Sequence, residues 1–188
     1  MFAIRFTESL LARISVLDGS RAVSDTPSAP DTLLGDWYVE RLGTRRLLCT
    51  SGVALLSVIT TAEPLDDLPT RLRDAVTDLF EVIGVPKPLI ARELRAMRWV
   101  QFAPATDPRV HAAMDRLLVA AHADAATDRP AASDTELAVR LGVLPIGSPF
   151  LGRGEPIRAT LELFGLPPES RELLQALEED WIEGASPD

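Results

Sequence analysis

Two histidines are the first candidates for chemistry, because histidine ionises near neutral pH and binds metal ions. His111 and His122 are about three helical turns apart, so a helix would place both on one face, with Asp115 one turn after His111. At about 1.5 Å of rise per residue the two rings lie roughly 16 Å apart, whereas zinc holds its nitrogen ligands at about 2 Å. One ion cannot bind both histidines, so we predict no metal site and expect a surface ion pair between His111 and Asp115.

Residues for nucleophilic catalysis are scarce. The single cysteine, Cys49, lies in a predicted strand with no histidine near it in the sequence, and a small buried side chain is the simpler interpretation. The chain has no G-x-S-x-G motif of a serine hydrolase and no G-x-x-x-x-G-K-[ST] phosphate loop. We therefore predict no catalytic residue and no cofactor.

Anion binding has two candidates. The loop Gly152–Glu155 could form a backbone nest with Arg153 beside it, although a loop that needs positive φ explains these glycines equally well. Arg92, Arg95 and Arg98 are spaced by three on a predicted helix and could form a phosphate-binding row. Because Glu93 lies among them, we expect surface ion pairs instead.

The most distinctive aromatic pair is Trp37 and Tyr38, which follow Asp36. In a functional interpretation both rings line a binding groove. In a structural interpretation one ring packs in the core and the other covers a sheet edge. We favour the structural interpretation and keep both residues as candidate binding residues.

Trp181 belongs to a second candidate surface near the end of the chain. It continues an apolar stripe from Leu173 and Leu177 on a helix predicted over residues 168–182, whose opposite face carries the acidic residues 178–180. Such a stripe docks either on its own domain or on a partner.

Charge and composition restrict the classes of partner. The 188 residues carry a formal net charge of −9, with 28 acidic against 19 basic side chains, so we expect no nucleic-acid binding. We find no signal peptide and no apolar stretch long enough to cross a membrane, so we expect a cytoplasmic protein without membrane contact. The chain has 18 arginines but only one lysine and no asparagine, and this composition indicates a bacterial genome rich in G and C.

The pattern of elements predicts an α+β fold in one domain, residues 1–188. A first strand over residues 2–6 precedes a loop over residues 18–31 that we expect to be mobile. Three strands then follow with short turns, which predicts an antiparallel meander; the last of them, Val53–Thr60, is apolar on both faces and should be central. The C-terminal half is mainly helical. Helices are predicted over residues 67–83, 88–97, 108–125, 134–142, 156–164 and 168–182, with one strand over 99–103.

The string Leu34-Gly-Asp-Trp-Tyr38, together with Ile4-Arg-Phe-Thr7 and the predicted meander, resembles a bacterial family of uncharacterised domains of about this length. The resemblance continues through Val85-Pro86 and the helix that begins at Leu89 and covers residues 2–114. It implies the α+β fold and a bacterial, cytoplasmic origin, but no activity.

Two segments depart from that family. Pro104–Arg109 stands where the family carries a Lys-Thr-x-Asn-Arg-Ser segment, and Val143–Pro145 stands where it carries Glu-Thr-Pro. Polar groups that could form a shared site are therefore mostly missing here. Our first hypothesis is a non-catalytic protein-interaction or regulatory domain of unknown oligomeric state. The alternative is an enzyme acting on a small anionic substrate, with Arg153 binding it and His111 or His122 as the base.

Overall fold

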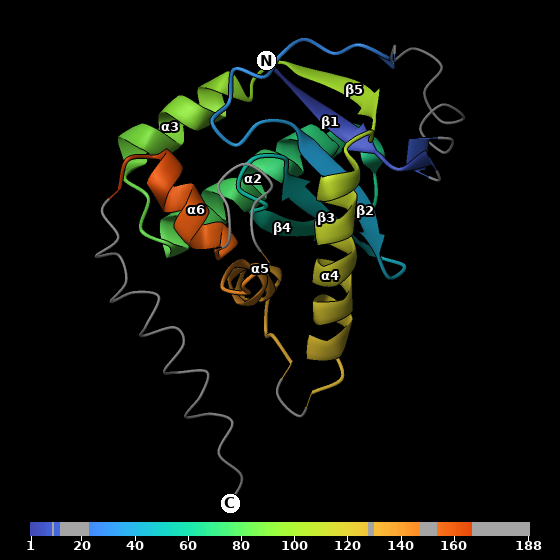
Figure 1. Ribbon diagram of the computed structural model, residues 1–188, viewed down its shortest axis with the longest axis vertical. Coiled ribbons are helices and arrows are strands. Elements are labelled where there is room, and N and C mark those ends of the chain that lie inside the picture. Colours follow the sequence, from blue (N-terminus) through green and yellow to red (C-terminus); the bar gives the residue numbers. More distant parts are fainter. Residues whose placement is uncertain (9, 12–22, 128–129, 147–153, 167–188) are drawn as a thin grey trace, which may run out of the picture.

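The first strand of the chain lies inside the sheet, between two strands that follow it in the sequence. The computed structural model describes residues 1–8, 10–11, 23–127, 130–146 and 154–166, and its five strands form one sheet in the order β4-β3-β2-β1-β5 (Figure 1). The strands are β1 (Phe2–Phe6), β2 (Trp37–Leu42), β3 (Arg46–Ser51), β4 (Ser57–Thr61) and β5 (Val100–Pro104).

The α+β class is confirmed, but the sheet is mixed rather than purely antiparallel. The predicted meander is present in β2, β3 and β4, where Trp37 pairs with Ser51 and Arg46 pairs with Thr61. β1, however, is parallel to both β2 and β5. Parallel neighbours need a long crossover connection, and the 30 residues between β1 and β2 supply one.

The strand expected at the centre lies instead at the edge of the sheet. β4 begins at Ser57, because the chain turns over residues 52–56 and Leu55 has a φ of 60°. Both faces of β4 are nevertheless buried, since helices α2 and α5 pack against it. Helical cover, and not a central position, explains its apolar sequence.

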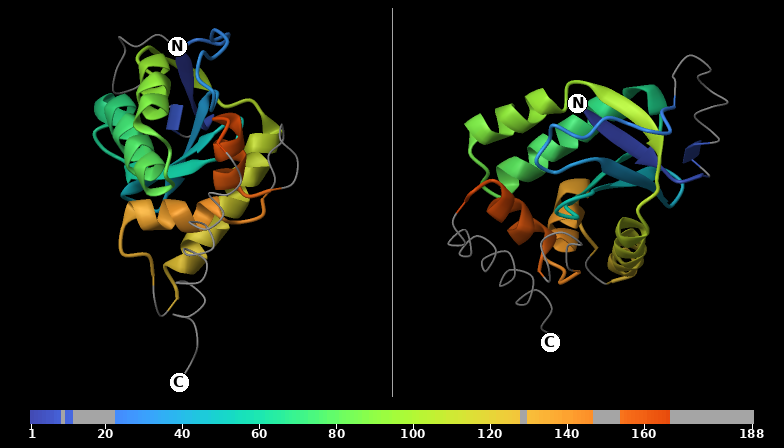
Figure 2. Two further views of the ribbon diagram at one scale, coloured as in Figure 1. Left: turned by 90° about the vertical axis from the view of Figure 1, so that its left-hand side faces the viewer. Right: turned by 45° about the horizontal axis from the view of Figure 1, so that its top comes forward.

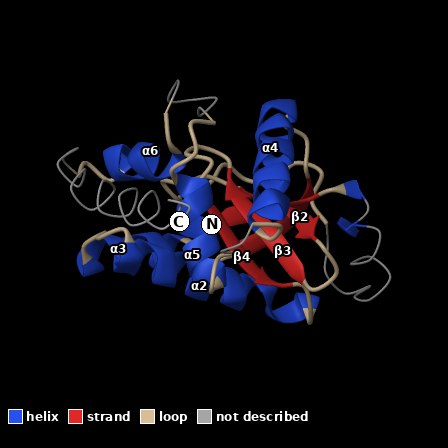
Figure 3. Cartoon of the chain, turned by 90° about the horizontal axis from the view of Figure 1, so that it is seen from below, coloured by secondary structure: helices blue, strands red, loops and turns tan. Residues whose placement is uncertain are grey.

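Helices cover both faces of the sheet. Figure 3 shows α2 and α3 on one side and α4 on the other, and the two views of Figure 2 show α2 and α3 side by side. The short 3-10 helix η1 (Leu65–Asp67) leads into α2 (Leu68–Val82), and the others are α3 (Lys87–Ala96), α4 (Pro108–Asp124), α5 (Asp134–Gly142) and α6 (Pro156–Leu163). None of the described helices is long and apolar enough to span a bilayer.

Two helix starts follow their sequence signals. Asp107 caps α4 by accepting a hydrogen bond from the backbone N–H of Arg109. The sequence Ser133-Asp-Thr-Glu136 forms a capping box at the start of α5: Ser133 Oγ accepts from the N–H of Glu136, and the Glu136 carboxylate accepts from the N–H of Ala132.

Part of the connection between β1 and β2 runs beside β5. Val23 forms an isolated parallel bridge with Phe102, and the backbone N–H of Ser28 donates to the side-chain oxygen of Gln101 at 2.9 Å. Asp31 is hydrogen-bonded to the amino-terminal residue through both its N–H and its carboxylate. The mobility expected for residues 18–31 stays a prediction, and residues 18–22 lie outside the described part.

Candidate functional site

The two adjacent aromatic candidates lie on opposite faces of the sheet. Trp37 is fully buried in the main core, on the same face as Ile4. Tyr38 faces the other way and packs with Leu55 and with α4 in a second cluster. Both rings are buried by the described residues themselves. The other two candidate binding residues, Arg153 and Trp181, lie outside the described part of the chain.

A row of polar side chains crosses the sheet on the face of Tyr38. The strand register places Arg5 opposite Tyr38, Tyr38 opposite Thr50, and Thr50 opposite Ser57. Thr50 and Ser57 are buried, and their hydroxyl oxygens are 2.9 Å apart, so each satisfies the other. Gly52 makes room for the row, because a Cβ there would lie 3.3 Å from the Tyr38 ring.

Arg5 is held in this row by an ion pair and by a backbone oxygen. Its Nε donates to Asp36 Oδ2 at 2.7 Å, and its Nη1 donates to the Pro104 oxygen at 3.2 Å. The second carboxylate oxygen of Asp36 accepts the N–H of Ala3 at 2.8 Å. The Arg5 guanidinium also lies over the Tyr38 ring, 5.8 Å from its centroid.

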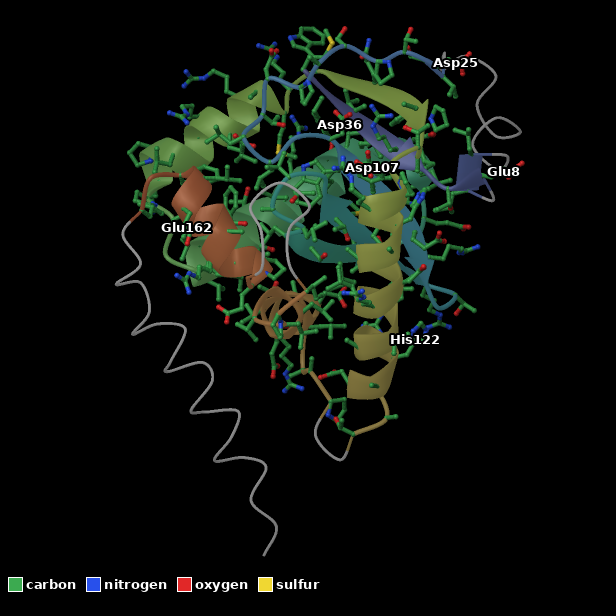
Figure 4. All side chains as sticks on the ribbon, in the orientation of Figure 1. Glu8, Asp25, Asp36, Asp107, His122 and Glu162 are labelled. Carbon is green, nitrogen blue, oxygen red and sulfur yellow. The ribbon has the colours of Figure 1, made fainter. Side chains whose placement is uncertain are left out.

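The start of α4 brings further ionisable groups towards Tyr38. The His111 ring meets the Tyr38 ring edge-on, with centroids 6.1 Å apart, while Asp107 binds Arg109 through both carboxylate oxygens. The hydrogen bond from Arg109 lowers the pKa of Asp107. Burial raises the pKa of Tyr38, with Arg5 opposing the rise. Figure 4 shows Asp107 at one end of α4 and His122 towards the other end.

This polar cluster is balanced in charge. Each of its arginines is paired with a carboxylate, Arg5 with Asp36 and Arg109 with Asp107, which leaves little net attraction for an anion. The Nε2 atom of His111 is buried without a hydrogen-bond partner among the described residues. His122 is exposed, and its Nδ1 lies 2.7 Å from the Leu118 oxygen of its own helix. No group of three or more metal-ligating side chains occurs in the described ranges.

A second surface, on α3 and the turn that leads from it to β5, has a different character. Arg92, Arg95 and Arg98 are all exposed, and Trp99, which follows, is 65% exposed. The Arg98 guanidinium lies over the Trp99 ring, 5.5 Å from its centroid. We call these four residues the arginine–tryptophan face. In the described part of the chain, Trp99 is the one exposed residue among the tryptophans, tyrosines and phenylalanines.

Glu93 does not pair with these arginines, contrary to the expectation from its place among them. Its side chain is buried, and its two oxygens accept the N–H groups of Leu33 and Leu34 at 3.1 Å each. Within the described ranges, Arg92, Arg95 and Arg98 form no ion pair. Because Glu93 points inward, α3 exposes only positive charge.

The sequence contains a signal for this arrangement. Glu93 stands three residues after Ile90 and four before Met97, and both of these are buried. That helical spacing puts Glu93 on the inner face of α3 and leaves the arginines outside. Burial raises the pKa of Glu93, and the two backbone N–H groups oppose the rise.

Comparison with known protein families shows which family the chain belongs to. Residues 3–159 match a family described as Domain of unknown function (DUF6933). The chain belongs to this family. The DUF6933 match runs from β1 into α6 and so confirms the resemblance to a family of uncharacterised domains; residues 160–188 lie outside it. No curated protein and no solved structure matches the chain.

Proposed function

We propose that this DUF6933 domain is a non-catalytic interaction module that binds an acidic segment of another protein through the arginine–tryptophan face. The observation that carries the proposal is Trp99, an exposed tryptophan stacked by Arg98 at the end of a helix whose exposed charges are all positive. Tryptophan and arginine dominate binding energy in protein interfaces, because they combine large contact area with directed polar groups.

Charge favours a protein over a nucleic acid as the partner. The neighbouring helix α2 exposes Asp74, Asp78 and Glu81, so the positive charge forms one narrow row beside a negative one. A phosphate backbone that follows the arginines would meet those carboxylates and the net charge of −9. A short acidic peptide lies along one helix and avoids them.

The alternative, an enzyme acting on a small anionic substrate, has less support. The cluster around Tyr38 pairs each of its arginines with a carboxylate, and His122 lies towards the far end of α4 (Figure 4). Cytoplasmic location in a bacterium with a GC-rich genome is part of the proposal, and it is supported by composition alone.

Photo-cross-linking in the native cell tests the function. A photoreactive amino acid replaces Ala91, an exposed residue of α3, in the full chain, and Ala112, an exposed residue of α4, serves as the matched control. We expect cross-links from position 91 to an acidic segment of another protein. Reversing Arg92, Arg95 and Arg98 to glutamate should reduce their yield at least about tenfold, since each tenfold change is about 1.4 kcal/mol of binding.

Two results would contradict the proposal. Cross-links from position 91 to nucleic acid would assign the face to another class of partner. Equal yields of the same protein from positions 91 and 112 would show that capture does not depend on this face.

A further inference from the structure

The acidic excess of the chain is concentrated after the described fold ends. Residues 167–188 contain seven acidic side chains and one arginine, a net charge of −6. The remaining residues carry 21 acidic and 18 basic side chains, so they are nearly balanced. The chain therefore holds one strongly negative segment and, on α3, one row of exposed positive charges.

This segment begins close to the start of α3. Phe164, which ends α6, meets Phe80 of α2 edge-on with ring centroids 5.2 Å apart, and Leu166 packs against the core. The N–H of Val85, in the turn from α2 to α3, donates to the oxygen of Phe80. Figures 1 and 2 show the end of α6 beside this turn. The described chain therefore ends near the turn from α2 to α3, at the end of α3 that is farther from Trp99.

Length and side-chain pattern suit that face. The ten residues of α3 span about 15 Å at 1.5 Å per residue, and the helix predicted over residues 168–182 would span about 22 Å, which is enough to reach Trp99. The segment carries the stripe of Leu173, Leu177 and Trp181 on one face and the acidic residues 178–180 on the opposite face. The acidic face can pair with the exposed arginines.

We infer that residues 167–188 dock on the arginine–tryptophan face of the same chain and compete there with the acidic partner. The inference rests on the proposed function and adds a mechanism that regulates partner binding: the domain is autoinhibited, and a partner must displace the segment. Because the segment is tethered, its local concentration at the face is high even if its intrinsic affinity is modest.

A spin label on the full chain tests the docking. Ala185→Cys places a single reactive thiol near the end of the segment, since the native Cys49 is fully buried. We expect a nitroxide at position 185 to reduce the intensity of the α3 amide signals and of the Trp99 indole signal at least twofold relative to the reduced label. The effect should disappear in about 1 M salt, where the Debye length is about 3 Å. Unchanged α3 signals, or equal losses on the amides of α4, would overturn the inference.

Two controls separate the alternatives. The first control neutralises three acidic residues together, by Glu178→Gln, Glu179→Gln and Asp180→Asn. It should weaken the broadening of the α3 signals. It should also raise the partner cross-link yield from position 91 at least about threefold, which corresponds to roughly 0.7 kcal/mol of competition. A spin-labelled copy mixed with a separate isotope-labelled copy should give no broadening; broadening there would assign the segment to a second copy and refute docking within one chain.

If α3 shows no broadening but partner capture still depends on the arginines, the proposed function stands and autoinhibition fails. If α3 broadens but capture does not depend on them, the proposed function fails.

Discussion

Arg5 and Asp36 form a partly buried ion pair, with Arg5 Nε 2.7 Å from Asp36 Oδ2, and it joins the string Ile4-Arg-Phe-Thr7 to the string Leu34-Gly-Asp-Trp-Tyr38. Arg5 belongs to the amino-terminal strand and Asp36 immediately precedes β2. Because the other oxygen of Asp36 accepts the N–H of Ala3, one carboxylate fixes β1 against the start of β2. The distinctive residues of this chain therefore have a structural role in its sheet.

Removing this carboxylate should destabilise the fold strongly. Asp36→Ala leaves the Arg5 guanidinium without its counter-charge and the N–H of Ala3 without an acceptor, and we expect a loss of about 3 kcal/mol in the free energy of unfolding. Asp36→Asn keeps one acceptor oxygen and should lose about half as much. Urea denaturation measures both. The matched control is Asp31→Ala, which removes an ion pair whose carboxylate side chain is 72% exposed and should cost under about 1 kcal/mol. Equal losses for Asp31→Ala and Asp36→Ala would contradict the account.

Glu93 predicts a particular dependence of stability on pH. Burial raises its pKa above the ordinary value of 4.5, so the folded chain binds more protons than the unfolded chain. The contribution of Glu93 to the free energy of unfolding must then fall as pH rises from about 4.5 through the raised native pKa, and stay constant above it. Glu93→Gln removes this titration, so the variant should gain stability relative to the wild type across the same window.

Urea denaturation between about pH 4 and pH 8 measures that difference. The amide introduced by Glu93→Gln has one acceptor oxygen for two N–H groups, which adds a loss of about 1–3 kcal/mol that does not vary with pH. Glu81→Gln, at an exposed position of α2, is the control and should change stability by no more than about 0.5 kcal/mol. A difference between Glu93→Gln and wild type that does not vary with pH would refute the role given to Glu93.

At position 55 we expect a glycine variant to be more stable than an alanine variant, which is the reverse of the usual order. Leu55 is fully buried beside Tyr38 and has a φ of 60°, a conformation that costs a residue with a side chain roughly 1–2 kcal/mol. Leu55→Ala and Leu55→Gly both lose the buried side chain, but only glycine relieves the backbone. We expect the glycine variant to be more stable than the alanine variant by about 1 kcal/mol in thermal or urea unfolding. A less stable glycine variant would show that the turn is unstrained.

Cys49 should be inert in the folded protein. Its side chain is fully buried, and burial raises its pKa to about 12, so the thiolate is scarce at neutral pH. A thiol reagent at about pH 8 should label the native chain at the rate at which it unfolds, and labelling should accelerate steeply with added urea. Rapid labelling of the native chain would contradict its burial and would also invalidate the single-label experiment on residue 185.

Local sequence patterns predicted the helices and strands well, but they did not predict which distant strands pair in the sheet. Strand and helix periods located the meander and the six described helices and strands of the C-terminal half to within a few residues. Nothing in residues 2–6 indicates that this strand lies between β2 and β5, because its apolar side chains satisfy any interior position. The apolar run over residues 53–60 misled for the same reason: burial by α2 and α5 looks like a central position in the sheet.

The site was harder to predict than the fold. Trp37 and Tyr38 were noticed because they are aromatic and adjacent, but adjacency in a strand sends them to opposite faces. The arginines of α3 were discounted because Glu93 lies among them in the sequence. The helical spacing of Glu93 with Ile90 and Met97 would have shown that its carboxylate turns inward, away from the exposed arginines.

The most direct test of the proposed function is a nuclear magnetic resonance titration of the full chain with the acidic segment recovered by cross-linking from position 91. We predict shifts at the Trp99 indole and at the amides of Arg92, Arg95 and Arg98. The amide shifts should vanish in Trp99→Ala and in the glutamate reversal of the three arginines. They should persist in Arg116→Glu, which changes an exposed arginine of α4. Shifts centred on α4 or on the Tyr38 cluster, with the α3 signals unmoved, would contradict the claim that the arginine–tryptophan face binds the partner.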